Sequence, residues 1–263
     1  MTARFGIAEG WRGLLLPAAL LTAWALAGAA GIGNPALFVP VDAVARAGLE
    51  TIASGELPAA IGATIARALF GWSIGALCGF AIGLLLGVSA LGSRFASPVL
   101  HGARQVALFA WIPLLSAWLG NGEAMKLALI ALSAFFPVFL NVEAGCRQVP
   151  LAFTEVGRLF GFNRASEIAC IIFPAATPTI IAGLELAFAV AWIGTIGAEY
   201  LIGTGYMYAS ADGIGAFLSG ARENARMDLV IVGILSLALT GFALDRAVVL
   251  ASRKVLAWRL QSR

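Results

Sequence analysis

Two carboxylates, Glu185 and Glu199, lie in an otherwise apolar stretch of this chain. In a helix their spacing corresponds to roughly 21 Å of rise and places them within about 40° of one face. Ionisable groups inside a membrane are costly and usually face a bundle interior or a water-filled cavity. The pair could therefore hold protons or cations on a pathway, or each acid could be bonded structurally to a neighbouring hydroxyl or backbone group. Trp192 lies between them and either lines the same pathway or packs in an aromatic core.

The chain has no motif for nucleotide binding or hydrolysis. A P-loop requires Gly-Lys-Ser or Gly-Lys-Thr after a glycine-rich turn, but the two lysines, Lys126 and Lys254, follow Met125 and Arg253. The sequence contains no HExxH, no GxSxG and only one histidine, His101. Its three cysteines form no CxxC pair and are predicted to be small buried side chains. We therefore expect no catalytic residue, metal site or cofactor on this chain.

A polar segment, 147–179, interrupts the apolar pattern and predicts a short helix outside the membrane. Pro150 suits the first turn of that helix, and Gly161 suits a left-handed stop after it. Asn163 is placed to cap a second helix that runs toward Pro174. Apolar side chains at helical spacing share one face of the first helix: Ala152, Val156, Leu159 and Phe160. Such a helix either docks in a groove on another protein or lies on the membrane or its own chain.

The composition predicts a polytopic membrane protein. The chain has 263 residues, of which 60% are hydrophobic and 12% charged, whereas soluble domains average about 45–50% and 25%. Six apolar segments are long enough to cross about 30 Å of hydrocarbon: 14–31, 65–89, 98–119, 125–144, 180–202 and 229–249. The range 98–119 is the weakest, since it contains polar residues and Pro113. We expect one all-α domain over residues 1–263.

The positive charges are distributed unevenly between the loops. Six spans place both termini on one side, which collects Arg4, Arg12, Arg94, Arg104, Arg147, Arg158, Arg164, Arg246, Arg253, Lys254, Arg259 and Arg263. The opposite side has Arg46, Lys126, Arg222 and Arg226, with Arg67 nearby. Because positively charged loops stay in the cytoplasm, both termini and the segment 147–179 are predicted to be cytoplasmic.

The second apolar segment carries a glycine at every fourth position. This spacing places them on one slowly drifting helix face, where the lack of side chains allows another backbone to approach closely. The stripe comprises Gly71, Gly75, Gly79, Gly83 and Gly87. It predicts either a tight, sliding contact with a neighbouring helix or second subunit, or static packing inside one subunit.

The polar segment resembles the cytoplasmic coupling motif of ABC importer permeases. Glu155, Gly161, Ile171 and Pro174 have the spacing of that motif. The family motif begins Glu-Ala-Ala and ends Ile-x-Leu-Pro; here Val156 and Gly157 replace the alanines and a phenylalanine replaces the leucine. Further fragments resemble the branch that handles aliphatic sulfonates, taurine, nitrate, bicarbonate and related small solutes: 110–115, 118–123, 135–141, 182–184, 191–193, 198–199, 221–222, 227–230 and 244–246.

The resemblance implies a type I ABC importer permease fold with six transmembrane helices, usually present as a homodimer in the inner membrane. It implies that two cytoplasmic ABC ATPase subunits bind ATP and Mg, and that an external binding protein delivers the solute. No nucleic acid is implied, and the chain itself is not an enzyme. The residues implied to transmit the ATPase motion are Glu155, Val156, Gly157, Arg158, Leu159, Phe160, Gly161, Ile171 and Pro174.

The sequence leaves both the solute and the energy source open. Glu185 stands where relatives that carry sulfonates often have a basic residue, and the spans contain no other basic residue deep in the membrane, which together argue against an anionic solute. An ion-coupled secondary transporter that uses Glu185 and Glu199 is an alternative to the importer. A membrane-embedded enzyme is a third hypothesis, but the chain lacks a nucleophile–base or metal constellation for it.

Overall fold

The computed structural model describes residues 15–16, 19–20, 22–26, 39–202 and 213–255. In the two long stretches the regular elements are all helices, α2 (Val41–Ala53), α3 (Glu56–Val88), α4 (Ala90–Ala103), the 3₁₀ turn η1 (Leu108–Trp111), α5 (Ile112–Leu119), α6 (Glu123–Arg147), α7 (Leu151–Leu159), α8 (Arg164–Glu167), the π turn η2 (Ile168–Ile172), α9 (Phe173–Ile202), α10 (Ile214–Glu223) and α11 (Met227–Val255). The all-α architecture that the composition predicts is thus present in the described residues.

Four helices are long and apolar enough to cross a membrane: Glu56–Val88, Glu123–Arg147, Arg164–Ile202 and Met227–Val255. They cover the predicted spans at 65–89 (except its last residue), 125–144, 180–202 and 229–249. The third of these is one continuous helix through α8, η2 and α9, so the helix that Asn163 caps runs directly into the predicted fifth span. Most of the predicted span 14–31 lies outside the described residues.

The predicted span 98–119 is wrong as a single helix. Helix α4 ends at Ala103, a turn follows, and η1 and α5 then continue to Leu119. Pro113 lies in the first turn of α5, where its missing N–H removes no helical hydrogen bond. Polar residues in the turn end α4, and the proline begins a new helix rather than continuing the old one.

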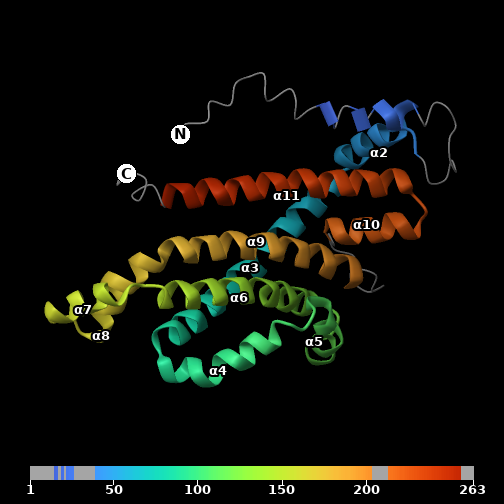
Figure 1. Ribbon diagram of the computed structural model, residues 1–263. Helices are drawn as coiled ribbons and strands as arrows, with labels where there is room; N and C mark the ends of the chain where they lie inside the picture. The colour runs from blue at the N-terminus through green and yellow to red at the C-terminus, as the bar shows by residue number, and fades with distance from the viewer. Residues whose placement is uncertain (1–14, 17–18, 21, 27–38, 203–212, 256–263) are drawn as a thin grey trace.

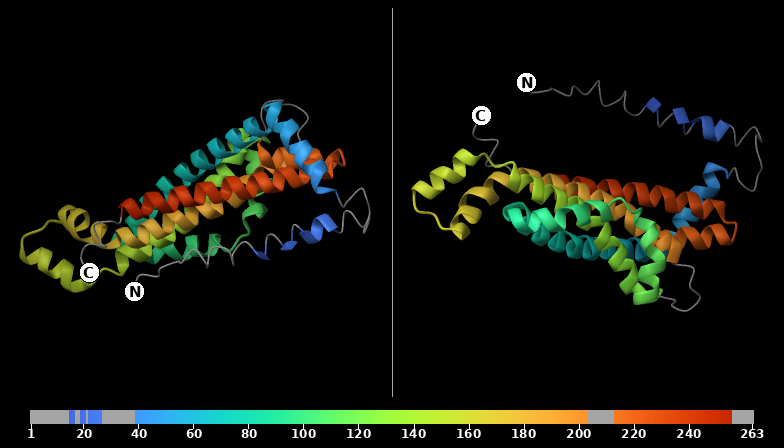
Figure 2. Two further views of the ribbon diagram at one scale, coloured as in Figure 1. Left: turned by 90° about the horizontal axis from the view of Figure 1, so that it is seen from above. Right: turned by 60° about the horizontal axis from the view of Figure 1, so that its bottom comes forward.

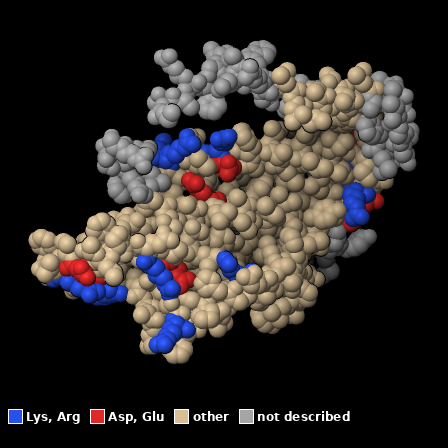
Figure 3. All heavy atoms as spheres, in the orientation of Figure 1, with Lys and Arg blue, Asp and Glu red and all other residues tan. Residues whose placement is uncertain are grey.

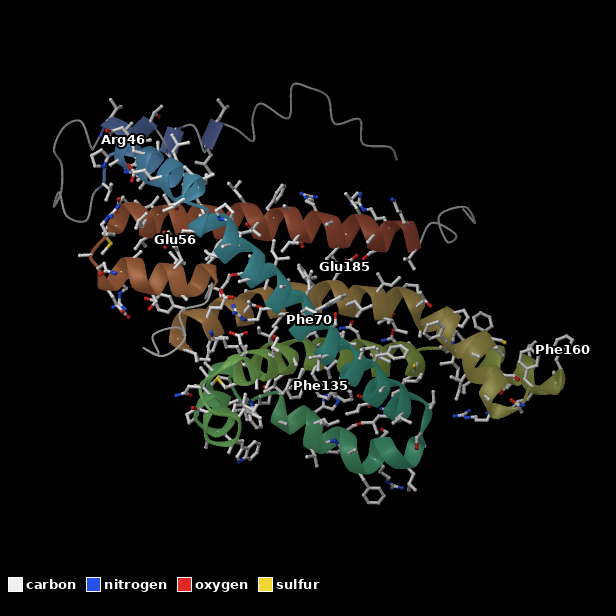
Figure 4. All side chains as sticks on the ribbon, turned by 180° about the vertical axis from the view of Figure 1, so that it is seen from behind. Arg46, Glu56, Phe70, Phe135, Phe160 and Glu185 are labelled. Carbon is white, nitrogen blue, oxygen red and sulfur yellow. The ribbon has the colours of Figure 1, made fainter. Side chains whose placement is uncertain are left out.

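Helix α6 lies at the centre of the bundle, between α3 and α9. It packs along both neighbours, and α3 crosses α6 and α9 diagonally (Figure 4). The largest fully buried side chains include Phe139 and Leu129 of α6 and Phe188 of α9. Since α6 is apolar on two opposite faces, it supplies the core that joins these three helices.

The glycine stripe of α3 faces α6 of the same chain. A methyl group at Gly79 would stand 2.6 Å from the carbonyl oxygen of Phe135, and one at Gly83 would stand 2.7 Å from that of Phe139. Gly71, Gly75 and Gly87 likewise abut α6, so all five predicted packing glycines share one partner. The contact lies within one subunit, which supports the interpretation that the stripe packs inside one subunit.

The remaining helices flank this core at its other end. Helix α11 runs alongside α9 and contacts α10 and α2, which lie together at the end of the bundle remote from α7 (Figures 1 and 2). The turn into α11 is closed by Arg226, which donates to Asp228 at 2.6 Å; these hydrogen bonds raise the pKa of Arg226 above its ordinary value. Within α11 only Val232 and Gly233 are buried, so most of the surface of this helix faces outward (Figure 3).

A protruding helix and two buried charge clusters

Helix α7 has defined ends. Pro150 occupies its N-cap with φ −58°, and Gly161 follows its C-cap with φ +78°. The N–H groups of Gly161 and Phe162 donate to the carbonyls of Arg158 and Gly157, both at 3.0 Å. This pair of bonds is the Schellman motif, which places glycine in the left-handed conformation. The prediction that Gly161 stops the helix is therefore confirmed.

Large apolar side chains of α7 and its C-cap are exposed in the described structure. Leu159 is 86% exposed, Phe160 78% and Val156 50%, and Glu155 is also exposed. Figure 4 shows Phe160 at the tip of the unit that α7 and α8 form beyond the ends of the long helices. Exposed apolar surface of this kind marks an interaction site.

At Gly157, α7 is fixed to the beginning of the α8–α9 helix. Gly157 lies directly against the Ile171 side chain, so a side chain at residue 157 would collide with it. Phe153, Val156, Ile171 and Pro174 line an apolar groove of about 660 Å³ beside this contact. The structure thus brings together the predicted residues Gly157, Ile171 and Pro174, which are separated in sequence.

A buried acid, Glu167, joins the same unit to α3. Arg158 of α7 and Arg164 of α8 approach its carboxylate at 3.6 and 3.2 Å. Arg164 also donates to the carbonyl oxygen of Val88, the last residue of α3, at 2.6 Å. The Arg158 side chain is also 64% exposed, so it faces water as well as Glu167. Glu167 was not among the predicted site residues, although its i,i+3 spacing from Arg164 was an available signal.

A second cluster surrounds Glu199, whose side chain is fully buried. Arg67 donates to its carboxylate, as do the Thr64 hydroxyl at 2.9 Å and the Gly215 N–H at 3.0 Å. The Thr64 hydroxyl in turn accepts from the Ile214 N–H at 2.8 Å. Glu199 therefore connects α9, α3 and the beginning of α10, which is the structural alternative that we considered for this residue.

Arg67 extends this cluster to α6. Its Nε and Nη2 atoms donate to the two oxygens of Glu123 at 2.8 and 2.9 Å, the fork geometry that arginine favours. The buried Lys126 lies 3.3 Å from the same carboxylate. Helices α3, α6 and α9 are thus joined through one arginine, and the sequence predicted neither the pairing of Arg67 nor the participation of Glu123.

Glu185 and Trp192 occupy a different environment from Glu199. Trp192 is half-buried and packs against Gly241 of α11. A methyl group added at Gly241 would stand 3.1 Å from the Cε2 atom of Trp192. Glu185 is half-buried on α9 near α11 (Figure 4) and has no hydrogen-bond or ion-pair partner in the described ranges. The two acids do not form one site, because Glu199 is enclosed by α3 and α10.

The arrangement defines a class of protein: a helical membrane bundle that carries a short helix with exposed apolar side chains beyond its membrane-spanning part. Residues 75–257 match the family described as "Binding-protein-dependent transport system inner membrane component". This chain belongs to that family, and it is an ABC transporter permease of the multi-pass inner-membrane kind.

Curated relatives identify the branch. The chain is 36% identical to the putative aliphatic sulfonates transport permease protein SsuC of Bacillus subtilis (strain 168), over 95% of this chain and 88% of that protein. It is 32% identical to the protein of the same description from Escherichia coli (strain K12), over 92% and 90%. It is also 28% identical to the taurine transport system permease protein TauC of Escherichia coli (strain K12), over 92% and 87%. The sulfonate, taurine and nitrate type of permease that the fragments resemble is therefore confirmed.

Proposed function

We propose that this chain is the membrane-spanning subunit of an ATP-driven importer. In this proposal it forms, as a homodimer, the translocation pathway for a small solute that an external binding protein delivers. The observation that carries the proposal is α7, whose apolar face is exposed while its glycine face is fixed to the bundle. A helix of this kind fits a groove on a partner protein, and the partner here is an ABC ATPase subunit.

The contacts of α7 explain how motion of the ATPase would reach the membrane. ATP and Mg bind to the partner ATPase and supply the energy. Gly157 against Ile171 transmits displacement of α7 to α9, and Arg164 transmits it to the end of α3 through Val88. Glu155 to Gly161, with Ile171 and Pro174, thus act as mechanical couplers.

The charge asymmetry of the sequence gives the orientation of the proposed importer. The α7 end of the bundle and both termini are cytoplasmic by the positive-inside rule, and α10 lies at the outer surface. The solute is a sulfonate, taurine, nitrate, bicarbonate or a similar small compound, since relatives are described as transporting aliphatic sulfonates, taurine, nitrate and bicarbonate.

The structure gives little support to an ion-coupled secondary transporter. Such a transporter would need Glu185 and Glu199 as binding sites, but Glu199 is already bonded to Arg67, Thr64 and Gly215. A buried acid with these partners is suited to holding helices together. Glu185 alone then remains for ion binding, and no hydrogen bond or ion pair links it to another described residue.

Substitutions at Gly161 test the docking of α7. We expect Gly161→Val to abolish co-purification of the ABC ATPase, because valine cannot adopt a φ of +78° without strain. Gly161→Asn is the matched control, since asparagine tolerates the left-handed conformation. A monodisperse Gly161→Val protein that retains the ATPase would refute the docking role.

Reconstitution tests the energy source. In liposomes, uptake should require ATP, the ATPase and the binding protein together. Uptake by this chain alone, driven by a proton gradient, would overturn the importer in favour of the secondary transporter.

A further inference from the structure

A pocket of about 340 Å³ opens on the side of the bundle between α6, α9 and the turn that follows α4. Its wall is largely apolar and includes Phe136 and Pro137 of α6 and Leu186 of α9. Arg104 lines it and is the only charged residue that does so. The pocket does not overlap the unit that α7 and α8 form, or the charge clusters around Glu167 and Glu199.

The pocket lies at the middle of the membrane-spanning helices. Its α6 residues run from Leu132 to Asn141, which is roughly 13 to 27 Å along a helix that begins at Glu123. The α9 residues Leu186 and Val190 are likewise near the centre of their helix. The sequence pattern grouped Arg104 with the basic residues of one membrane face, but the structure places it beside this pocket, at mid-depth.

Arg104 differs from most of the deeply placed cations in having no partner. Arg67 and Lys126 are each paired with a carboxylate, whereas no described carboxylate lies within ion-pair distance of Arg104 and its side chain is exposed. Because an unpaired arginine at this depth is costly, it is expected to face a cavity or a substrate path.

The donors in the pocket favour an anion. The guanidinium group offers several N–H donors in a planar fork, which matches the oxygens of a carboxylate, sulfonate or nitrate. The Trp111 side chain, which also lines the pocket, has an indole N–H without a hydrogen-bond partner in the described part of the chain. The Asn141 amide donates to the Pro137 carbonyl at 2.8 Å and so is already engaged.

We propose that Arg104 is a specificity-determining residue, and that this pocket is a transient binding site for a small monoanion whose apolar part contacts Leu186 and Phe136. Its place on the pathway rests on the proposed importer function. Glu185 does not line the pocket, so its charge does not oppose an anion there. The expectation that the spans contain no other deep basic residue is thus corrected by the position of Arg104.

A reporter cysteine tests the anion preference without transport. Leu186→Cys is introduced into a Cys78→Ser, Cys170→Ser background, in which the buried Cys146 is retained. The purified full-length protein is labelled with a sulfonatoethyl or a trimethylammonioethyl methanethiosulfonate, and the ratio of the anionic to the cationic rate is measured. The same background without the reporter measures labelling elsewhere.

We expect Arg104→Gln to lower this ratio about ten-fold, since one positive charge near the reporter is removed. Arg104→Lys should retain most of it. Arg94→Gln is the matched control because Arg94 is an exposed arginine on the preceding helix that does not line the pocket; it should leave the ratio unchanged. An unchanged ratio in a monodisperse Arg104→Gln protein would overturn the anion site.

ATP-driven uptake of ethanesulfonate, taurine and nitrate by the complete transporter then tests the pathway. Loss of uptake in Arg104→Gln, with basal ATPase activity retained, supports the proposal. Normal uptake in that variant would remove Arg104 from the pathway even if the labelling ratio falls. If the parent transporter imports none of the three probes with ATP present, the importer function is contradicted for these solutes. The labelling ratio tests the anion site independently of that result.

Discussion

The cluster around Arg67 makes an asymmetric prediction about stability. Replacing Arg67 by methionine leaves the fully buried Glu199 without a cation, because only Arg67 pairs with it among the described residues. Replacing Glu199 by glutamine leaves Arg67 bonded to Glu123 through two nitrogens at 2.8 and 2.9 Å. The first change therefore strands a buried charge, and the second does not.

The magnitudes follow from this difference. Removing one member of a buried ion pair costs about 3–5 kcal/mol, which for a chain of this size corresponds to a fall in Tm of roughly 10 °C. Glu199→Gln loses charge-assisted hydrogen bonds but keeps an acceptor oxygen for Thr64 or Gly215, so its cost is about 1–2 kcal/mol. The corresponding fall in Tm is roughly 5 °C.

Thermal unfolding of the detergent-purified protein, followed by size-exclusion chromatography after heating, measures both shifts. Arg46→Gln is the control, because its pair with Asp42 is exposed on both sides and should contribute little. The double variant Arg67→Met, Glu199→Leu should recover part of the loss, since it removes both charges. Equal shifts for the two single variants, or a double variant less stable than Arg67→Met, would refute the reasoning.

Three further outcomes follow from the helix contacts. Gly79→Leu should abolish monodisperse protein, because even a methyl group at residue 79 would lie 2.6 Å from a carbonyl oxygen of α6. Gly62→Ala should be tolerated, since the space around Gly62 is open. Equal yields of monodisperse protein for the two variants would contradict the packing of α3 on α6. Gly157→Val should reduce ATPase co-purification, and Ile171→Ala should restore it if their collision is the cause; failure of rescue would exclude that cause. Glu167→Gln should leave ATPase binding intact and lower ATP-driven uptake several-fold, so unchanged uptake would argue against its role in transmission.

Much of the fold was predictable because its signals are local. The apolar segments at 65–89, 125–144, 180–202 and 229–249 are long and nearly uncharged, and the structure has a helix at each. The ends of α7 were predictable for the same reason, since proline and glycine constrain the backbone at their own positions. The break in 98–119 was not, because Pro113 is compatible with either a kinked helix or a new one.

The charged sites were harder to predict because their partners are distant in sequence. Arg67 meets Glu199 and Glu123 only after α3, α6 and α9 pack together. Arg104 could be placed from sequence only by the distribution of charges along the chain, with the segment 98–119 that contains it taken as one span. The turn that follows α4 changes the depth of that side chain, and no local pattern specifies this change.

The contacts indicate which parts of the subunit move as one. Helices α3, α6 and α9 are interlocked by glycines along their length and joined at one end through Arg67. At the other end Arg164 ties α8 to α3. A body held at both ends and close-packed between them offers little internal freedom. In the proposed importer, displacement of α7 would therefore rotate this body as a unit, and the pathway would open between two copies of the chain, where the apolar surface of each remains exposed.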